Sequence, residues 1–349
     1  MTPSQFDLLI RRLIAVKTPK VVILLILLIS WLDVEKHERE FQVVEFYAGV
    51  GRVASLAKWV GYKTAAIDVL YGENRAKPGG RKPMDINGSA GFVLCVLLLL
   101  NGEWEAMVCT FAIVCSSWVP VNRHSTHRSL LTPLGNENFT GVRRANKMTS
   151  RTVILILIVV LSGGTYLMEN PALSLIALHP RYIWVVDRLA EFGILTHKVS
   201  FWMRKYLSMS WKRTWVWGNT RRIAGLDLGP MTDQEREDSE PTTTTYIDAA
   251  GKKRFKGNPN LKRSQQYTFR FASTLVSMVP KLREDSIGRK MPVEVVEGSL
   301  VELFNRLPWD EEGAAWELEA DLKELIIYVR GSKKLRIPSE WRCAIPTAI

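Results

Sequence analysis

Cysteine is scarce in this sequence, and its few cysteines are poorly spaced for cross-linking or metal binding. There are four, Cys95, Cys109, Cys115 and Cys343, and no two of them form a Cys-x-x-Cys pair. Disulfide frameworks and structural zinc sites both need a denser pattern of ligands. The sequence therefore favours a reducing compartment, with a nuclear or cytoplasmic location.

The N-terminal region lacks an apolar run of the ~20 residues that cross a bilayer. The run VVILLILLISWL, residues 21–32, is shorter and follows several basic residues. That order is typical of a signal peptide, but no small-residue cleavage pattern follows it. We expect an apolar N-terminal helix packed into the fold. A strand, or a signal or membrane anchor, are the alternatives, and a membrane partner is not expected.

Acidic residues are too few to balance the basic ones. Asp and Glu number 35 against 47 Lys and Arg, which gives a formal net charge of +12. Such a charge fits an anionic partner, usually nucleic acid, and we expect DNA ahead of RNA. A basic surface with no partner is the alternative. His124 and His127 form a His-x-x-His pair without companion ligands, so we expect no metal site.

Short apolar runs alternate with longer helical patterns from Phe41 to about Asn219. This alternation predicts an α/β fold with a mostly parallel sheet and helices on both faces. The expected strands are QVVEFY, KTAAID, AMVCTF, TYLMEN, THKVSFW and TWVWG. The expected helices lie near residues 52–61, 90–100, 143–162 and 172–192. RTVILILIVVL, residues 151–161, is apolar nearly all round and predicts a buried helix.

Changes in composition divide the chain into five parts. Residues 1–40 hold the apolar helix and its lead-in, and residues 41–219 hold the core. Residues 220–264 are polar and predict a basic loop or small hairpin, in which Lys252, Lys253 and Arg254 either follow a phosphate backbone or form a solvated face. Residues 265–282 predict an amphipathic helix that closes the core. Residues 283–349 form a small C-terminal appendage.

The stretch EFYAGVGRVA places Gly49 and Gly51 in a turn between a strand and a helix. Glycine allows positive φ and lets a ligand approach the backbone closely. Asp68 ends the next strand, where an acid commonly binds the ribose of an adenosine cofactor. The third glycine of a dinucleotide turn is missing, and Glu45 suits a cofactor with a positive charge, such as S-adenosylmethionine. A tight connection without a ligand is the alternative.

Other reactive side chains follow later strands. Cys115 follows the strand AMVCTF, where a nearby base or cation could make it a nucleophile. Glu169 and Asn170 end TYLMEN and could bind the edge of a base. Lys212 and Arg213 begin TWVWG and suit a phosphate or a base carbonyl. The alternatives are a buried structural thiol, a helix cap at Asn170 and Pro171, and a solvated strand entry.

Taken in order, these motifs resemble the cytosine-5 DNA methyltransferases, within the class I S-adenosylmethionine-dependent methyltransferases, over residues 41–279. EFYAGVGRVA is similar to their glycine loop, AAID to the ribose-binding acid, and PMDI to the pair beside the adenine. VCSSW stands where the family has Pro-Pro-Cys-Gln, and ENP where it has Glu-Asn-Val. WKRTWVWG resembles the Gln-Arg-x-Arg stretch, and QQYTFRFASTLV the closing helix. Uncharacterised methyltransferase-like proteins of unicellular algae are at least as similar.

The resemblance implies a Rossmann-like sheet, S-adenosylmethionine as cofactor and methyl transfer to a nucleic-acid base, with cytosine C5 in DNA as the target. The implied cofactor-binding residues are Glu45, Phe46, Tyr47, Gly49, Gly51, Asp68, Asp85 and Ile86. The implied catalytic residues are Cys115, which attacks C6 of the base, Glu169, which binds the ring edge and N3, and Arg213. The implied nucleic-acid contacts are Arg123, Asn170, Lys212, Lys252, Lys253 and Arg254.

The sequence departs from the family pattern where the chemistry is expected. Neither proline precedes Cys115, and Ser116 replaces the glutamine. A catalytically inactive module that binds nucleic acid or a protein is therefore the alternative function. Methyl transfer to RNA or protein is a further alternative. The sequence does not determine the oligomeric state.

Overall fold

The computed structural model describes residues 1–32, 40–72, 82–287, 291, 293, 295, 297–309, 316–331, 337–342 and 344–345. Cys343 and most of the predicted lead-in between Leu32 and Phe41 lie outside these ranges. Within them, no helix is both long enough and apolar enough to span a bilayer.

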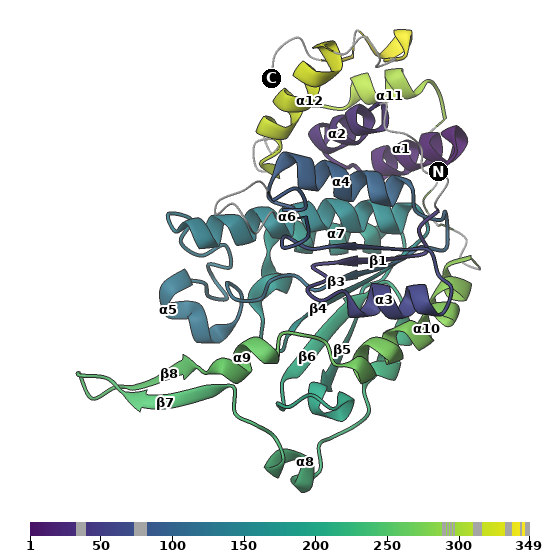
Figure 1. Ribbon diagram of the computed structural model, residues 1–349. Coiled ribbons are helices and arrows are strands. Elements are labelled where there is room, and N and C mark those ends of the chain that lie inside the picture. Colours follow the sequence, from purple (N-terminus) through teal and green to yellow (C-terminus); the bar gives the residue numbers. More distant parts are fainter. Residues whose placement is uncertain are drawn as a thin grey trace.

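A six-stranded, mostly parallel sheet forms the centre of the fold (Figure 1). Its strands are β1 (Val43–Phe46), β2 (Thr64–Ile67), β3 (Val108–Phe111), β4 (Thr165–Pro171), β5 (His197–Trp202) and β6 (Arg213–Gly218), in the order β2-β1-β3-β4-β6-β5. Strand β1 pairs in parallel with β2 and β3, and β3 with β4, whereas β6 is antiparallel to β4 and β5. All six predicted strands and the α/β class are confirmed.

Helices cover both faces of the sheet, as predicted. One face carries α4 (Ser89–Leu100), α6 (Thr140–Leu161) and α7 (Pro180–Glu191), and the other carries α3 (Arg52–Trp59) and α10 (Phe269–Ile287) (Figure 1). Successive side chains of a strand point to opposite faces. Val108 and Leu167 therefore share a core with α3 and α10, whereas Phe111 and Met168 share one with α4 and α6.

Helix α6 passes through the interior, which explains its apolar sequence. Every residue from Thr149 to Leu161 is buried, so the predicted buried helix is confirmed. Burying one aliphatic side chain of this size contributes about 1.5–3 kcal/mol. The helix can therefore anchor structural layers on both of its sides.

The helix predicted over residues 172–192 is wrong in its first half. The structure has a short 3-10 helix, η2 (Leu175–Leu178), and α7 begins only at Pro180. Proline lacks an N–H group and fits the first turn of a helix but not its interior. His179 caps the new helix, because its Nδ1 accepts a hydrogen bond from the Arg181 N–H at 3.3 Å. Asn170 lies within β4 and caps no helix.

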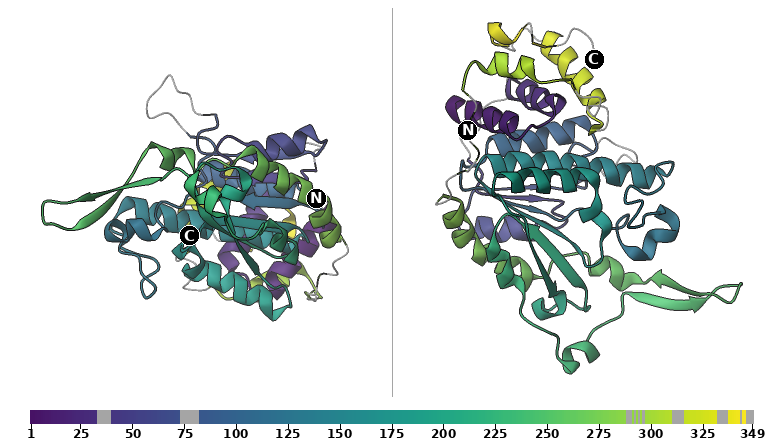
Figure 2. Two further views of the ribbon diagram at one scale, coloured as in Figure 1. Left: turned by 90° about the horizontal axis from the view of Figure 1, so that it is seen from below. Right: turned by 180° about the vertical axis from the view of Figure 1, so that it is seen from behind.

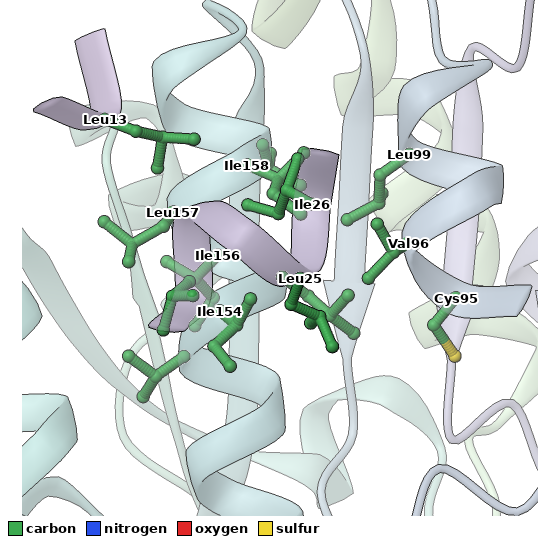
Figure 3. Packing of buried hydrophobic residues seen from close by; sticks show 14 of the residues in the cluster. Leu13, Leu25, Ile26, Cys95, Val96, Leu99, Ile154, Ile156, Leu157 and Ile158 are labelled. Carbon is green, nitrogen blue, oxygen red and sulfur yellow. The ribbon is translucent and has the colours of Figure 1, made fainter. Parts of the chain in front are cut away.

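A further layer of helices lies outside α4 and α6 (Figures 1 and 3). It comprises α1 (Pro3–Ala15), α2 (Lys20–Ser30), α11 (Leu300–Arg306), α12 (Glu319–Gly331) and the 3-10 helix η6 (Ser339–Trp341). Where one apolar helix was predicted within residues 1–40, the structure has two. Leu25 and Ile26 of α2 lie among Val96, Leu99 and Ile158 of α4 and α6 (Figure 3). The apolar run of α2 is therefore core sequence.

Arg12 joins this outer layer to the core. Its guanidinium is buried, lies over the Trp104 ring at 5.2 Å, and donates from Nη1 to the Leu161 carbonyl at 2.7 Å. Leu161 ends α6, and the last carbonyls of a helix lack intrahelical partners and carry partial negative charge. The Arg12 guanidinium of α1 thus gives the C-terminal end of α6 a hydrogen-bond donor and a positive charge.

The polar segment after β6 takes the hairpin form of its two predicted alternatives. It contains η4 (Arg221–Leu226), α8 (Asp233–Glu237), the antiparallel strands β7 (Thr243–Ile247) and β8 (Lys253–Gly257), and α9 (Pro259–Arg263). Figures 1 and 2 show the hairpin projecting from the body on the same side as α5 (Arg123–Thr126). Two further short helices among the described residues are η1 (Pro120–Asn122) and η3 (Met203–Tyr206).

Candidate active site

The order of the strands reverses at β1. From β1 the chain continues to β2 on one side of it, whereas β3 pairs with its other side. Ligands of open α/β sheets bind at such a reversal, outside the carboxyl ends of the strands. The glycine turn follows β1, Cys115 follows β3 and Glu169 lies near the end of β4. The topology therefore brings the two predicted groups of residues to one edge.

The glycine turn has the conformation that its sequence predicts. Gly49 and Gly51 have φ of 57° and 67°, in the left-handed region that favours glycine. The Gly49 N–H donates to Asp68 Oδ2 at 2.8 Å, and the Leu70 N–H donates to Asp68 Oδ1 at 3.0 Å. The half-buried Asp68 carboxylate therefore lies against the turn, with lone pairs left to accept further hydrogen bonds.

Glu45 is a buried acid beneath this turn. Glu45 is 2% exposed, and its Oε2 accepts a hydrogen bond from the Ala54 N–H of α3 at 2.8 Å. The pKa of Glu45 is raised to about 7, mainly because the carboxyl is buried; the backbone N–H groups of α3 oppose this rise, and Asp68 adds to it. A cation bound beside it would favour the carboxylate. Glu45 thus suits a positively charged ligand.

The other predicted cofactor residues fall into two groups. Asp85 is half-buried, forms an ion pair with Arg144 of α6 at 3.1 Å, and lies before α4. The side chains of Tyr47, Phe46 and Ile86 point into the protein interior. The Tyr47 hydroxyl shares a hydrogen bond of 2.7 Å with the Thr152 hydroxyl, Phe46 is fully buried and stacks on Phe111 at 4.8 Å, and the Ile86 side chain is 4% exposed. The side chains of Phe46 and Ile86 are buried, so contact with a cofactor would come from their backbone atoms.

Gly91, in the first turn of α4, fixes the backbone of Asp85. A Cβ at Gly91 would lie 2.2 Å from the Asp85 carbonyl oxygen, too close for any real contact, whereas a Cβ at Gly141 in the first turn of α6 meets nothing within 4 Å. We expect Gly91→Ala to lower the free energy of unfolding by about 2 kcal/mol, in the range of an overpacked core. Gly141→Ala, the matched control, should raise it by about 0.5–1 kcal/mol through helix propensity. Denaturant titration measures both, and equal effects would contradict this packing.

A row of polar residues crosses the face of the sheet that α10 covers. The strand register places Glu45 opposite Thr110, and Thr110 opposite Leu167, two residues before Glu169. Glu45, Thr110 and Glu169 therefore point to the same face. The Thr110 hydroxyl is buried and has no hydrogen-bond partner among the described residues. Sequence reasoning missed Thr110, although a threonine within the apolar strand β3 was the available signal.

Cys115 lies beside a cluster of charged and polar groups. Lys212 Nζ pairs with Glu169 Oε1 at 3.2 Å, and the Tyr267 hydroxyl donates to Glu169 Oε2 at 3.4 Å. Burial raises the pKa of the half-buried Cys115 thiol; Lys212 lowers it and Glu169 raises it. The cluster therefore joins a nucleophile, a cation and an acid at one strand edge. Tyr267 was missed because it lies far along the chain, just before α10.

The side chain of Arg213 does not reach this cluster, so the structure does not bring it together with the other two predicted catalytic residues. Its Nε donates to the Ser200 hydroxyl at 2.9 Å, and its guanidinium lies over the Trp202 ring at 5.3 Å. Lys212 and Arg213 are consecutive where β6 begins, so their side chains leave opposite faces. Because β6 is antiparallel to β4, its first residues lie beside the end of β4. Lys212, and not Arg213, therefore reaches Glu169.

The loop that carries Cys115 is held by Arg128 instead of prolines. The buried Arg128 guanidinium lies 3.5 Å from the centre of the Trp118 ring, and donates to the Ser117 hydroxyl at 2.9 and 3.1 Å and to Asn146 Oδ1 at 2.8 Å. Asn170 adds a hydrogen bond from Nδ2 to the Ile113 carbonyl at 3.0 Å. These contacts fix both ends of the loop, so the absence of the prolines does not leave it unsupported.

The predicted nucleic-acid residues do not converge on one point. Asn170 is fully buried and serves the loop, so its predicted contact with nucleic acid is wrong. Arg123 is exposed on α5. Lys252 and Lys253 are exposed at the far end of the hairpin, where the half-buried Arg254 pairs with Asp248 at 2.8 Å. α5 and the hairpin lie on the same side of the molecule (Figure 2).

Within the described ranges, no group of three or more His, Cys, Asp or Glu side chains is placed to hold a metal ion.

The candidate site consists of two groups of residues. One is the glycine turn with Glu45 and Asp68, and the other is Cys115 with Lys212, Glu169 and Tyr267. A scan against protein-family models, a search of curated proteins and a search of solved structures each found no match to this chain.

Proposed function

We propose that the chain is an S-adenosylmethionine-dependent methyltransferase that acts on a nucleic-acid base, with cytosine C5 in DNA as the target. The observation that carries the proposal is the meeting of two half-sites at one sheet edge. One is a glycine turn with a ribose-type acid and a buried carboxylate. The other is a cysteine beside Lys212 and Glu169. Tyr267 links them, because its hydroxyl donates to Glu169 Oε2 at 3.4 Å and its carbonyl accepts a hydrogen bond from Arg52, the first residue of α3 after the glycine turn.

The residues at the end of β1 fit the proposed cofactor. The free lone pairs of Asp68 would accept hydrogen bonds from ribose hydroxyls, and the Gly49 and Gly51 backbone allows the cofactor to approach closely. Glu45 would face the positively charged methionine portion. When bound, S-adenosylmethionine supplies an electrophilic methyl group.

The chain's own residues would then act on the base. The Cys115 thiol would pass its proton to the Glu169 carboxylate and add to C6 of cytosine, and Glu169 would deliver that proton to N3, so that electron density develops at C5. C5 would gain the methyl group from the cofactor, which leaves as an uncharged thioether. A water molecule would take the C5 proton, Glu169 would take back the N3 proton, and the S–C6 bond would break to release the Cys115 thiolate. Lys212 stabilises the thiolate before attack and again after release.

The raised pKa of Glu45 makes cofactor binding release protons. In the free protein at pH 7, about half of the molecules carry a protonated Glu45, since its pKa is about 7. Because a bound cation lowers this pKa, we expect release of about half a proton at pH 7 and almost none at pH 9. Calorimetric titration in buffers of different ionisation enthalpy measures this number. The Glu45→Gln variant should lose the proton release that the wild-type protein shows at pH 7. Identical proton release in both proteins would contradict the assignment of this proton to Glu45.

The projecting hairpin supports a nucleic-acid partner. Lys252, Lys253 and Lys256 are exposed on it, together with the apolar and aromatic side chains of Ile247 and Phe255. Basic side chains neutralise phosphates, and exposed aromatic rings can stack on bases. The arm projects on the side of the strand edge that holds Cys115, so one bound molecule could contact both.

Methyl transfer to defined substrates tests the proposal. The purified protein is incubated with labelled S-adenosylmethionine and either duplex DNA, single-stranded DNA or RNA, and the nucleic acid is digested for mass spectrometry of its nucleosides. We expect 5-methylcytosine from DNA. Labelled RNA or labelled protein would reassign the substrate, and no label in any of them would overturn the proposed activity.

A catalytically inactive binding module is the second candidate. The observation that favours it is that Glu169 is already bound by Lys212 and Tyr267. Burial also raises the pKa of Cys115, which disfavours the thiolate. Cofactor or nucleic-acid binding without any methyl transfer would support this candidate.

A further inference from the structure

A buried arginine holds the loop that leads into α4. Arg151 of α6 is 0% exposed, and its Nη1 donates to the Ile86 carbonyl at 2.6 Å and to the Gly88 carbonyl at 3.0 Å. Its guanidinium also lies over the Phe92 ring at 4.7 Å. Asp85 adds an ion pair with Arg144 of α6 at 3.1 Å, and local bonds such as Gly88 N–H to the Asp85 carbonyl at 2.8 Å complete the loop. Arg151 therefore ties this loop to the interior.

The partner of Arg151 comes from the C-terminal appendage. Arg151 Nη2 lies 2.5 Å from Asp321 Oδ2 of α12, and both side chains are 0% exposed. Burial lowers the Arg151 pKa, and Asp321 is the main group that raises it again. A buried charge is tolerated when it is paired and hydrogen-bonded. The ion pair joins two residues that lie 170 positions apart in the sequence.

We infer that Arg151 and Asp321 are positioning residues that make helix α12 a structural part of the cofactor site. The inference rests on the proposed function, because it takes Asp85 and the Ile86 backbone as the adenine side of the pocket. Asp321 keeps the guanidinium charged and oriented, and the guanidinium holds the Ile86 and Gly88 carbonyls. Neither side chain touches the cofactor.

The geometry permits a variant that separates positioning from folding. Removing one partner of a buried ion pair leaves an uncompensated charge and is strongly destabilising, whereas replacing both partners by apolar side chains of similar volume is often neutral. Arg151→Met combined with Asp321→Leu fills the space but donates nothing to the loop. The matched control is Glu319→Gln with Lys323→Met, which removes an exposed ion pair of 2.7 Å on the same helix.

The experiment has two readouts on the full chain. Hydrogen exchange followed by mass spectrometry reports on residues 84–91, and calorimetric titration reports the affinity for S-adenosylmethionine. For the Arg151→Met/Asp321→Leu variant we expect at least tenfold faster exchange in residues 84–91 and at least tenfold weaker cofactor binding, with the melting temperature near that of wild type. The control variant should change neither.

Exchange in residues 84–91 that matches wild type in the folded double variant would overturn the inference. Faster exchange with unchanged cofactor affinity would also overturn it, because the loop would then be held without serving the site. If wild-type protein binds no S-adenosylmethionine, the proposed function fails, and the exchange readout still decides whether Arg151 and Asp321 position the loop.

Discussion

Replacing Cys115 by serine is expected to reduce methyl transfer by about 1000-fold or more while leaving the affinity for S-adenosylmethionine unchanged. A serine hydroxyl is a far weaker nucleophile than a thiolate, and no described group beside Cys115 is placed to remove its proton as a strong base. Residues that form a covalent bond with the substrate have effects of this size when removed. Single-turnover measurement with labelled cofactor and DNA gives the rate.

Ser116→Ala is the matched control, because Ser116 is the exposed neighbour of Cys115 in the same loop. It should retain nearly full activity. Full activity in the Cys115→Ser protein would eliminate the covalent route and leave methyl transfer, if observed, to direct attack by the substrate.

Replacing Lys212 by methionine is expected to lower methyl transfer by about 100-fold or more. Lys212 favours the thiolate of Cys115, so its loss removes the one interaction with a neighbouring side chain that lowers the pKa of that thiol. It also leaves Glu169 without its ion-pair partner. The comparable change Arg213→Met should have a small effect, because Arg213 faces Ser200 and Trp202 on the other side of the sheet.

The pH dependence of Cys115 alkylation checks this assignment independently of any substrate. Since Lys212 lowers the pKa of the thiol, its removal should shift the alkylation curve to higher pH, while Arg213→Met should leave the curve in place. A shift caused by Arg213→Met and not by Lys212→Met would reverse the roles of the two residues.

The sequence predicts the fold well because each strand or helix leaves a signal within a short stretch of sequence. Strands such as TYLMEN and TWVWG are short apolar runs between polar turns, and all six lie where they were predicted. The exceptions also have local reasons. Pro180 divides a predicted helix, and the N-terminal apolar run forms one of two helices, because it packs against other helices and its periodicity does not reveal where the chain turns.

The candidate site is predictable only in part, because the contacts between its side chains depend on how the strands pair. WKRTWVWG contains two cations in a row, and only the antiparallel pairing of β6 with β4 determines that Lys212 faces Glu169. Arg128, Tyr267 and the Arg151–Asp321 pair act across long sequence separations. No spacing rule links such residues, so their roles emerge from the packing of the folded chain.

The cofactor pocket is the central claim, and calorimetric titration of wild-type protein and the Asp68→Ala variant with S-adenosylmethionine tests it most directly. We predict micromolar binding to wild type and at least a tenfold loss in the variant, because Asp68 supports the Gly49 turn and would bind the ribose. A folded wild-type protein that binds no S-adenosylmethionine would contradict the account.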